Sequence, residues 1–182
     1  PMVDRLVELK RLGVKIYLFE GNHDFFLKEY FGDVLGMDVY EQWGEFELDG
    51  LKFLIGHGDT ADETNAAYLL FRRILRSRIF YQFQRLLPRK LIWRIASVSS
   101  AASREWNSDD GKVLFQKMAS FARQRLEESY DVVVLGHSHR AAVEKYIING
   151  KEKTLVALGD WIRHYSFVYY EKGKFILGRY RP

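Results

Sequence analysis

Short runs of consecutive apolar residues alternate with amphipathic stretches along this chain of 182 residues. Residues 2–12 place apolar side chains at helical spacing and are followed by Gly13, a residue type that commonly ends helices. The apolar run at residues 14–19 then predicts a buried strand. Further along, residues 112–128 predict a longer helix, and the apolar run at residues 132–135 predicts a second buried strand.

Asp110 is the candidate N-cap of the longer helix. The side of this helix that faces the core is expected to carry Val113, Met118, Phe121, Ala122 and Leu126. Three hairpins are also predicted, because turn residues separate pairs of apolar runs. They span residues 46–55 around Asp49-Gly50, residues 141–158 around Asn149-Gly150, and residues 168–177 around Gly173. Helices followed by short buried strands indicate a layered α/β fold.

Three of the apolar runs end in a glycine that is followed by histidine-bearing polar residues. The motifs are GNHD at residues 21–24, GHGD at residues 56–59 and GHSH at residues 136–139, and they contain four of the five histidines. Where strands are buried on both faces of a sheet, ligands bind beyond the carboxyl ends of the strands. We therefore expect these three loops to converge on one site.

The residue types in these loops suit a divalent transition metal. The candidate ligands are the amide oxygen of Asn22 and the ring nitrogens of His57, His137 and His139. A single histidine at a strand end is usually a satisfied polar residue, whereas three such motifs together favour a metal centre. For Asp24 and Asp59, capping of a turn is the alternative to a role in the site.

Composition limits the class of protein. With 47% apolar residues the chain can bury a substantial core, and its length suits one domain over residues 1–182. The absence of cysteine excludes disulfides and thiolate metal ligands. The net charge of +4 is divided unevenly, because residues 64–104 carry nine basic residues and no acidic one, which leaves the rest of the chain at −5. This segment therefore calls for its own explanation.

The basic segment at residues 64–104 predicts an inserted amphipathic helical cap. Apolar residues recur at every fourth position before Pro88, on one helical face: Ala67, Phe71, Leu75, Ile79 and Phe83. One interpretation is a helical hairpin packed on the core with its arginines in water. The other is a cap beside the metal site, whose apolar face holds acyl chains and whose arginines meet phosphates or an anionic membrane surface. The lack of any acidic residue in this segment favours the second interpretation. Because its aromatic residues lie among aliphatic ones, we expect no nucleic-acid partner.

In order and in position, the three glycine-histidine motifs resemble the last three motifs of the calcineurin-like metallophosphoesterase superfamily. The resemblance implies an α/β fold, a layered metallophosphoesterase-like β-sandwich flanked by helices, with the basic segment as an inserted cap. It implies two divalent metal ions, with Mn²⁺ first and Fe, Co or Zn as alternatives. The ligands it implies are Asn22, His57 and His137 for one ion and His139 for the other. His23 would protonate the leaving group or stabilise its charge, oriented by Asp24.

More closely, the chain is similar to the UDP-2,3-diacylglucosamine hydrolase family over nearly its whole length. The similarity includes HGDTADETNAAYLLFR at residues 57–72, the basic segment, and LGDW at residues 158–161. It implies hydrolysis of the pyrophosphate bond of a nucleotide-activated glycolipid, UDP-2,3-diacylglucosamine, to lipid X and UMP in lipid A biosynthesis. It also implies a cytoplasmic protein that is peripheral on the inner membrane. The residues implied in substrate binding are Asn65, Tyr68, Arg72, Arg73, Arg76 and Ser103.

The chain departs from the family pattern in three respects. Well-known members carry arginine where His23 stands, and residues 99–110 lack several lysines, although Ser103 matches a substrate-contacting serine. The family's first two motifs, Asp-x-His and Gly-Asp-x-x-Asp, do not precede Asn22. Those motifs supply most ligands of one metal ion and the carboxylate that bridges both.

The missing motifs lead us to expect a domain without its N-terminal part, which binds at most one metal ion, has little hydrolase activity and tends to associate. Two alternatives stay open. The chain could belong to another phosphodiesterase or phosphatase acting on a nucleotide or lipid phosphate. It could also be a non-catalytic module that binds membranes or nucleic acid, with a degenerate metal site.

Overall fold

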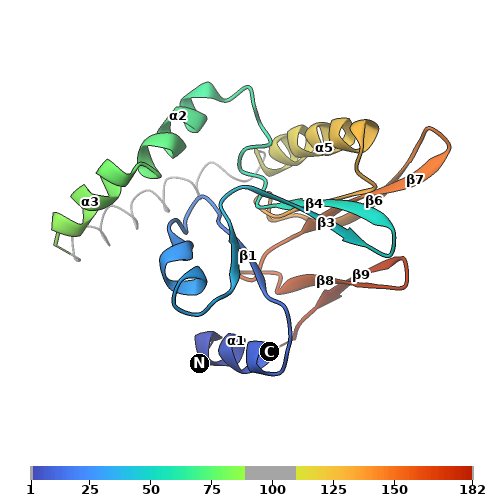
Figure 1. Cartoon of the computed structure of the whole chain (residues 1–182). Helices are drawn as coiled ribbons and strands as arrows, with labels where there is room; N and C mark the ends of the chain where they lie inside the picture. Colours follow the sequence, from blue (N-terminus) through green and yellow to red (C-terminus); the bar gives the residue numbers. More distant parts are fainter. Residues whose placement is uncertain (1, 89–109, 182) are drawn as a thin grey trace.

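The computed structural model describes residues 2–88 and 110–181, and its centre is a five-stranded sheet in the order β3-β4-β5-β7-β6 (Figure 1). The five strands are Trp43–Leu48 (β3), Leu51–Gly56 (β4), Val132–Leu135 (β5), Ala141–Ile148 (β6) and Lys151–Leu158 (β7). Strands β4, β5 and β7 run parallel, whereas the edge strands β3 and β6 are antiparallel to their neighbours. The carboxyl ends of the three parallel strands therefore meet at one edge of the sheet.

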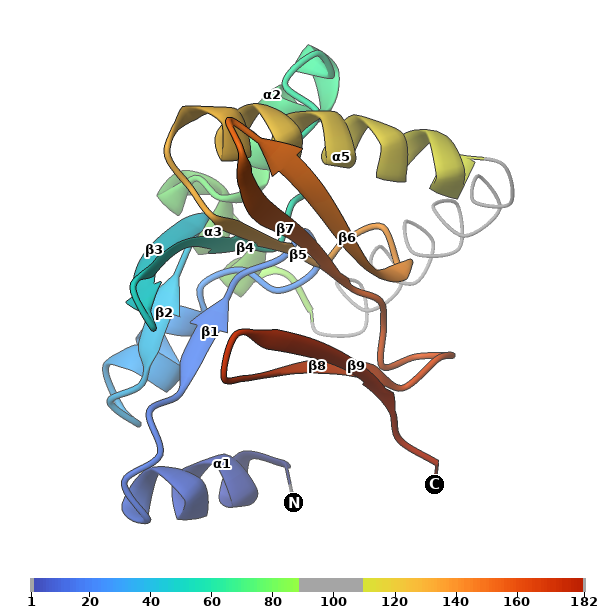
Figure 2. The ribbon, with the colours of Figure 1, turned by 90° about the vertical axis from the view of Figure 1, so that its right-hand side faces the viewer.

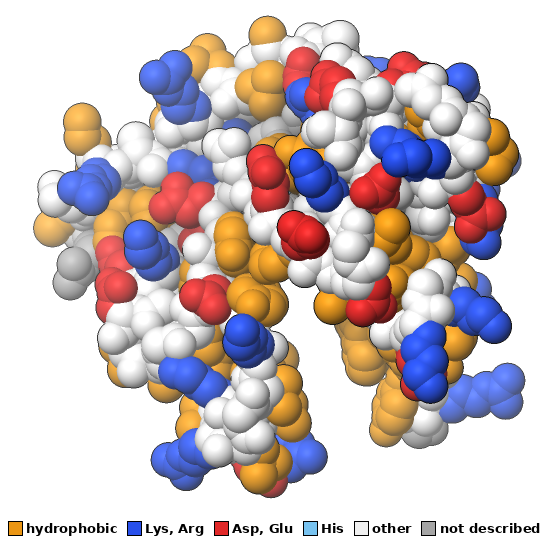
Figure 3. Space-filling view, turned by 45° about the vertical axis from the view of Figure 1, so that its right-hand side comes forward, with side chains coloured by type: hydrophobic (Ala, Val, Ile, Leu, Met, Phe, Trp, Pro, Cys, Tyr) orange, Lys and Arg blue, Asp and Glu red, His pale blue; other side chains and the backbone are white. Residues whose placement is uncertain are grey.

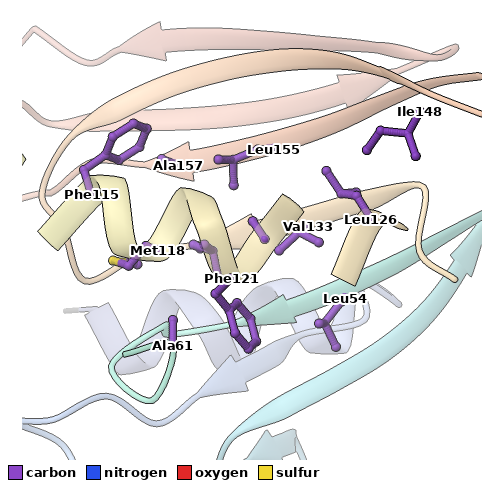
Figure 4. Close-up of a cluster of buried hydrophobic side chains, with 12 residues drawn as sticks. Leu54, Ala61, Phe115, Met118, Phe121, Leu126, Val133, Ile148, Leu155 and Ala157 are labelled. Carbon is purple, nitrogen blue, oxygen red and sulfur yellow. The ribbon is translucent and has the colours of Figure 1, made fainter. Parts of the chain in front are cut away.

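One face of this sheet is covered by the helix α5, Asp110–Glu128 (Figure 2). Met118, Ala122 and Leu126 of the helix are almost completely buried against sheet residues such as Leu155 (Figure 4). The prediction that Val113 faces this core is wrong, because its side chain is 53% exposed. Val113 lies nine residues before Ala122, and at 3.6 residues per turn that spacing puts the two on opposite sides of the helix.

The other face of the sheet is covered by an antiparallel hairpin of β8 (Ser166–Glu171) and β9 (Lys174–Arg179). The ring of Phe53 in β4 lies 5.6 Å from that of Tyr170 and 6.1 Å from that of Phe175, between centroids. The central strands are thus buried on both faces, as their apolar runs predicted. The α/β class is confirmed: a mixed sheet lies between a helix and a second β layer.

The N-terminal part forms a smaller unit beside β3. Helix α1 (Met2–Arg11) buries none of its residues, and β1 (Tyr17–Phe19) is shorter than the predicted strand. β1 pairs in parallel with β2 (Asp38–Tyr40), with the short π-helical turn η1 (Lys28–Gly32) between them; neither β2 nor η1 was predicted. The Tyr40 ring stacks on Phe19 at 5.0 Å and lies 5.4 Å from Phe46 of β3. These aromatic contacts join the small sheet to the large one.

The helices α2 (Ala66–Leu75) and α3 (Arg78–Leu86) project from the body of the molecule (Figure 1). The predicted single helix is interrupted at Ser77, whose hydroxyl caps α3 by accepting a hydrogen bond from the Phe80 N–H at 3.2 Å. The exposed apolar residues on the two helices are Leu70, Phe71, Ile74, Ile79, Phe83 and Leu86. The rest of the predicted cap lies outside the described residues. In the part of the chain that is described, no helix is both long and apolar enough to cross a membrane.

Hydrophobic side chains are also exposed on the lower part of the molecule, on both sides of a notch (Figure 3). Phe167, Tyr169 and Ile176 are exposed on the face of the β8–β9 hairpin that points away from the main sheet. The expectation that the chain associates stays a prediction.

Candidate metal centre

Three loops bring their polar side chains together at the carboxyl edge of the sheet. His57 follows β4 and His137 follows the adjacent parallel strand β5, so the two imidazoles are neighbours, with ring centroids 5.0 Å apart. His57 Nε2 lies 3.2 Å from His137 Nδ1 and 3.0 Å from Asn22 Oδ1. Asn22 comes from the loop after β1, which belongs to a different sheet. The structure therefore places three of the four predicted ligands around one point.

The backbone of the GHSH motif bends sharply to direct its histidines. His137 has a φ of 58° and His139 a φ of 56°, in the left-handed region that residues other than glycine seldom adopt. The Ser138 N–H donates to the Gly136 carbonyl at 2.7 Å, which makes His137 the centre of a γ-turn of the rare, strained form. Such strain persists only where the surrounding structure imposes it, and it is concentrated at functional sites.

Gly21 allows His57 to approach the loop after β1. A Cβ atom at this position would lie 3.0 Å from His57 Cε1 and 2.8 Å from Asp24 Oδ1. The Gly21 N–H itself donates to Asp24 Oδ1 at 2.8 Å. Asp24 therefore closes the loop, which is the capping role named as an alternative for it. Its predicted role of orienting His23, whose side chain is exposed, stays a prediction.

The two central imidazoles are held in their neutral form. Burial lowers the pKa of His137 to about 4, with a further lowering from the adjacent His57. Burial also lowers the pKa of His57, and it outweighs the opposing effect of the Asp59 and Asp24 carboxylates. The nearby His23 and His139 act on this pKa in the same direction as burial. A neutral imidazole has the free lone pair that a metal ligand needs. The four strand-end histidines are therefore close enough to influence one another.

His139 lies at the rim of the centre. Its side chain is 59% exposed, and its Nδ1 is 3.9 Å from Asp160 Oδ2. Among the residues that the structure describes, no group of three or more His, Cys, Asp or Glu side chains is arranged to hold a metal ion. The donor set at the centre is accordingly two imidazoles and one amide. Such a set fits one divalent ion and contains no carboxylate ligand.

The carboxylate of Asp59 is committed to the cap rather than to the histidines. Its Oδ2 accepts hydrogen bonds from Arg72 Nε at 2.7 Å and from the Tyr68 hydroxyl at 2.9 Å. Burial alone would raise the pKa of Asp59, but the hydrogen bonds and charge of Arg72 outweigh it and hold that pKa below its usual value. This buried ion pair fastens α2 to the loop after β4.

Two further residues predicted to bind substrate also have structural partners. Arg76 Nη1 pairs with the buried Glu20 at 2.7 Å, and its Nη2 donates to the Gly21 carbonyl at 3.2 Å. Asn65 caps α2, because its Oδ1 accepts a hydrogen bond from the Tyr68 N–H at 3.1 Å. The interpretation in which the cap arginines lie free in water is therefore wrong for Arg72 and Arg76.

The other two residues predicted to bind substrate have no such outcome. Arg73 is exposed, and Ser103 lies outside the described residues.

A groove of about 910 Å³ lies between α2, β3 and the end of α5, and none of the strand-end histidines lines it. Trp43 and Phe121 line this groove with rings stacked at 5.0 Å, and Arg73 lines it as well. The chemistry of the strand ends, not the size of this groove, identifies the candidate centre.

The buried pair of Arg72 and Asp59 leads to a stability prediction. Arg72→Ala leaves a buried carboxylate without its cation, and we expect the free energy of unfolding to fall by about 3–5 kcal/mol. Arg73→Ala, at the adjacent exposed position, is the matched control and should change it by less than about 0.5 kcal/mol. Urea denaturation of both variants measures the difference. Equal effects of the two substitutions would contradict the structural role of Arg72.

A mixed sheet with a histidine-rich centre at its carboxyl edge and a projecting helical pair defines an α/β protein with a candidate metal centre. Comparison with known proteins gives the family. The chain is 30% identical over 164 residues to the UDP-2,3-diacylglucosamine hydrolase of Aliivibrio fischeri, covering 89% of this chain and 68% of that protein. It is 30% identical over 162 residues to the enzyme of that name from Pseudomonas entomophila, covering 87% of this chain. The chain belongs to the UDP-2,3-diacylglucosamine hydrolase family.

This membership confirms the resemblance that the three motifs indicated. The chain spans 66% of the length of the P. entomophila protein. No protein-family model matches the sequence. A solved archaeal phosphodiesterase aligns with 93% of the chain at 17% identity and a TM-score of 0.43, which is too low to support an argument.

Proposed function

We propose that the protein hydrolyses the pyrophosphate bond of UDP-2,3-diacylglucosamine, giving lipid X and UMP, with the aid of divalent metal ions. The observation that carries the proposal is the convergence of three side chains at the carboxyl edge of the sheet. His57 Nε2 lies 3.0 Å from Asn22 Oδ1 and 3.2 Å from His137 Nδ1. Membership of a family whose named members act on this substrate supports the choice of reaction. The layered sheets around the centre suit a metallophosphoesterase-like β-sandwich.

The residues that would hold the first ion are Asn22, His57 and His137, with His139 available to a second ion. When bound, divalent ions of this kind, Mn²⁺ first among them, neutralise charge on the phosphate and activate the attacking water. The protein's own contribution is to keep both central imidazoles neutral by burial and to direct His137 through the strained turn at that residue. Preorganisation of this sort lowers the cost of assembling the site.

In this proposal His23 would serve the leaving group. It is exposed beside the centre, and it lies near enough to His57 and His137 to lower the pKa of both. As an imidazolium it would donate a proton to the departing phosphate oxygen, or hydrogen-bond to it as charge develops. The Asp24–Gly21 hydrogen bond holds the loop that carries His23 in place.

The projecting helices would bring the protein to its substrate at the cytoplasmic face of the inner membrane. Phe71, Ile79 and Leu86 are 57%, 83% and 82% exposed and offer an apolar surface for acyl chains. Arg73 and Arg78 are exposed on the same helices and are free to meet anionic headgroups. Arg72 and Arg76 would act indirectly, by fixing α2 against Asp59 and Glu20.

Vesicle binding tests this role of the cap. Arg73→Glu with Arg78→Glu should weaken binding to anionic vesicles at least about tenfold, since each basic residue near such a surface contributes about 1 kcal/mol. Wild-type binding should fall as salt rises. The control, Lys112→Glu with Lys151→Glu, makes the same charge change at exposed positions outside the cap and should have little effect. Binding that is indifferent to cap charge and to salt would refute the electrostatic role.

A non-catalytic binding module is the second candidate. It is favoured because the described residues contain no group of three or more His, Cys, Asp or Glu side chains arranged to hold a metal ion. Hydrolysis of bis-p-nitrophenyl phosphate by the Mn²⁺-loaded protein separates the two. Metal-dependent turnover supports the hydrolase. Stable metal binding with no turnover on this ester or on UDP-2,3-diacylglucosamine would support the module, provided that the result is the same when a segment bearing the Asp-x-His and Gly-Asp-x-x-Asp motifs is joined to the chain.

A further inference from the structure

The loop between β7 and β8 lies at the same edge of the sheet as the candidate metal centre (Figure 2). It carries Asp160, whose Oδ2 is 3.9 Å from Nδ1 of the rim residue His139. Trp161 is the next residue, with its Cα about 3.8 Å from that of Asp160. The residue that directly follows the neighbour of His139 in sequence is therefore a large aromatic one.

This loop is held rigidly. Asp160 Oδ1 accepts hydrogen bonds from three backbone N–H groups, those of Ile162 at 2.8 Å, Arg163 at 2.6 Å and His164 at 3.2 Å. The Asp160 N–H donates to Ser166 Oγ at 3.1 Å, and that hydroxyl donates to the Leu158 carbonyl at 2.8 Å. The position of Trp161 relative to His139 is thus set before any ligand arrives.

Trp161 is nevertheless largely open to solvent, since 59% of it is exposed. One side of its indole stacks on Tyr180, with centroids 5.9 Å apart and an angle of 24° between the planes, and Tyr165 meets it edge-on at 6.1 Å. An exposed aromatic ring that is already oriented by two others loses little conformational entropy when a further ring stacks on it. Stacking on such a ring is how proteins hold nucleobases with little regard to their hydrogen-bonding edges.

We propose that Trp161, backed by Tyr180, is the platform on which the base of a nucleotide substrate stacks while its phosphate lies at the Asn22–His57–His137 centre. This inference rests on the proposed function and extends it, because it assigns the nucleotide half of the substrate to the β7–β8 loop and leaves the acyl half to the projecting helices. Trp161 would then favour a nucleotide substrate over a phosphate ester that lacks a base.

Calorimetric titration of the metal-loaded protein with UMP and with ribose 5-phosphate tests the platform, because ribose 5-phosphate carries a hydroxyl group where UMP carries its base. We expect UMP to bind the wild type about ten- to a hundredfold more tightly, the range that one stacked base contributes. Trp161→Ala should bring UMP down to the affinity of ribose 5-phosphate and leave ribose 5-phosphate unchanged, and Trp161→Phe should restore most of the difference. Ile162→Ala, the adjacent position at 72% exposure, is the matched control and should bind both ligands as the wild type does.

The two ideas fail in different ways. Equal binding of UMP and ribose 5-phosphate by the wild type, with metal-dependent phosphodiester hydrolysis intact, would overturn the platform and leave the proposed function standing. Failure of both ligands to bind, together with absence of hydrolysis, would overturn both. Trp161 is also of a type that anchors proteins at membrane interfaces. Trp161→Ala that weakens vesicle binding but leaves UMP affinity unchanged would overturn the platform in favour of that role.

Discussion

Replacing His57 with alanine is expected to remove metal-dependent phosphodiester hydrolysis from the chain once it is joined to a segment bearing the Asp-x-His and Gly-Asp-x-x-Asp motifs. His57 Nε2 is the atom that lies nearest to both Asn22 Oδ1 and His137 Nδ1, so its loss leaves two ligands that no longer share a centre. We expect turnover to fall at least about a thousandfold, since a bound ion supplies several kcal/mol of transition-state stabilisation and each 1.4 kcal/mol is tenfold in rate. Bound metal should fall in parallel.

His164→Ala is the control for this experiment, because it removes the one histidine that lies outside the three motifs. It should keep its metal. A His57→Ala protein with full metal content and wild-type turnover on bis-p-nitrophenyl phosphate would show that the centre lies elsewhere.

Replacing His23 should separate chemistry from metal binding. His23→Ala removes the leaving-group acid but none of the ligands, so we expect turnover to fall by about 10²–10⁴-fold with metal retained. Well-known family members carry arginine at this position, so His23→Arg should recover part of the loss by restoring a cation beside the leaving group. Parallel assays of turnover and metal content give the answer. Loss of metal from His23→Ala would make His23 a ligand instead.

The convergence of the strand-end loops could be predicted because it depends on a general property of parallel strands. β4 and β5 are short and apolar, so both are central, and their carboxyl ends must lie side by side. His57 and His137 follow directly. The position of Asn22 was harder to predict, because β1 belongs to a separate two-stranded sheet. That sheet is held beside the large one by aromatic contacts such as that of Tyr40 with Phe46.

The roles of the cap arginines could not be predicted from local pattern. Helical spacing places Arg72 and Arg76 on α2, but it carries no information about where α2 docks. Their partners, Asp59 and Glu20, become visible only when the helix lies against the loops after β4 and β1. The break at Ser77 was also missed, because apolar residues continue to recur at every fourth position across it. The Ser77 hydroxyl nevertheless caps a new helix there.

The strand β2 and the contact of Asp160 with His139 were missed for a related reason. β2 has only three residues and is defined by its parallel partner β1, a non-local pairing that leaves little trace in the sequence around it. Asp160 belongs to a loop after β7, and its approach to His139 follows from the parallel pairing of β5 with β7. The sequence LGDW offered a signal there, but only as part of a family resemblance.

Titration of the 182-residue chain with Mn²⁺, read by the electron paramagnetic resonance of the free ion, tests the central claim most directly. Asn22, His57 and His137 provide one site without a carboxylate, and Asp59 is occupied by Arg72. We therefore predict at most one ion bound per chain, with modest affinity, and none in His137→Ala. Binding that survives in His137→Ala unchanged, or two tightly bound ions in the wild-type chain, would contradict the site described by these three residues.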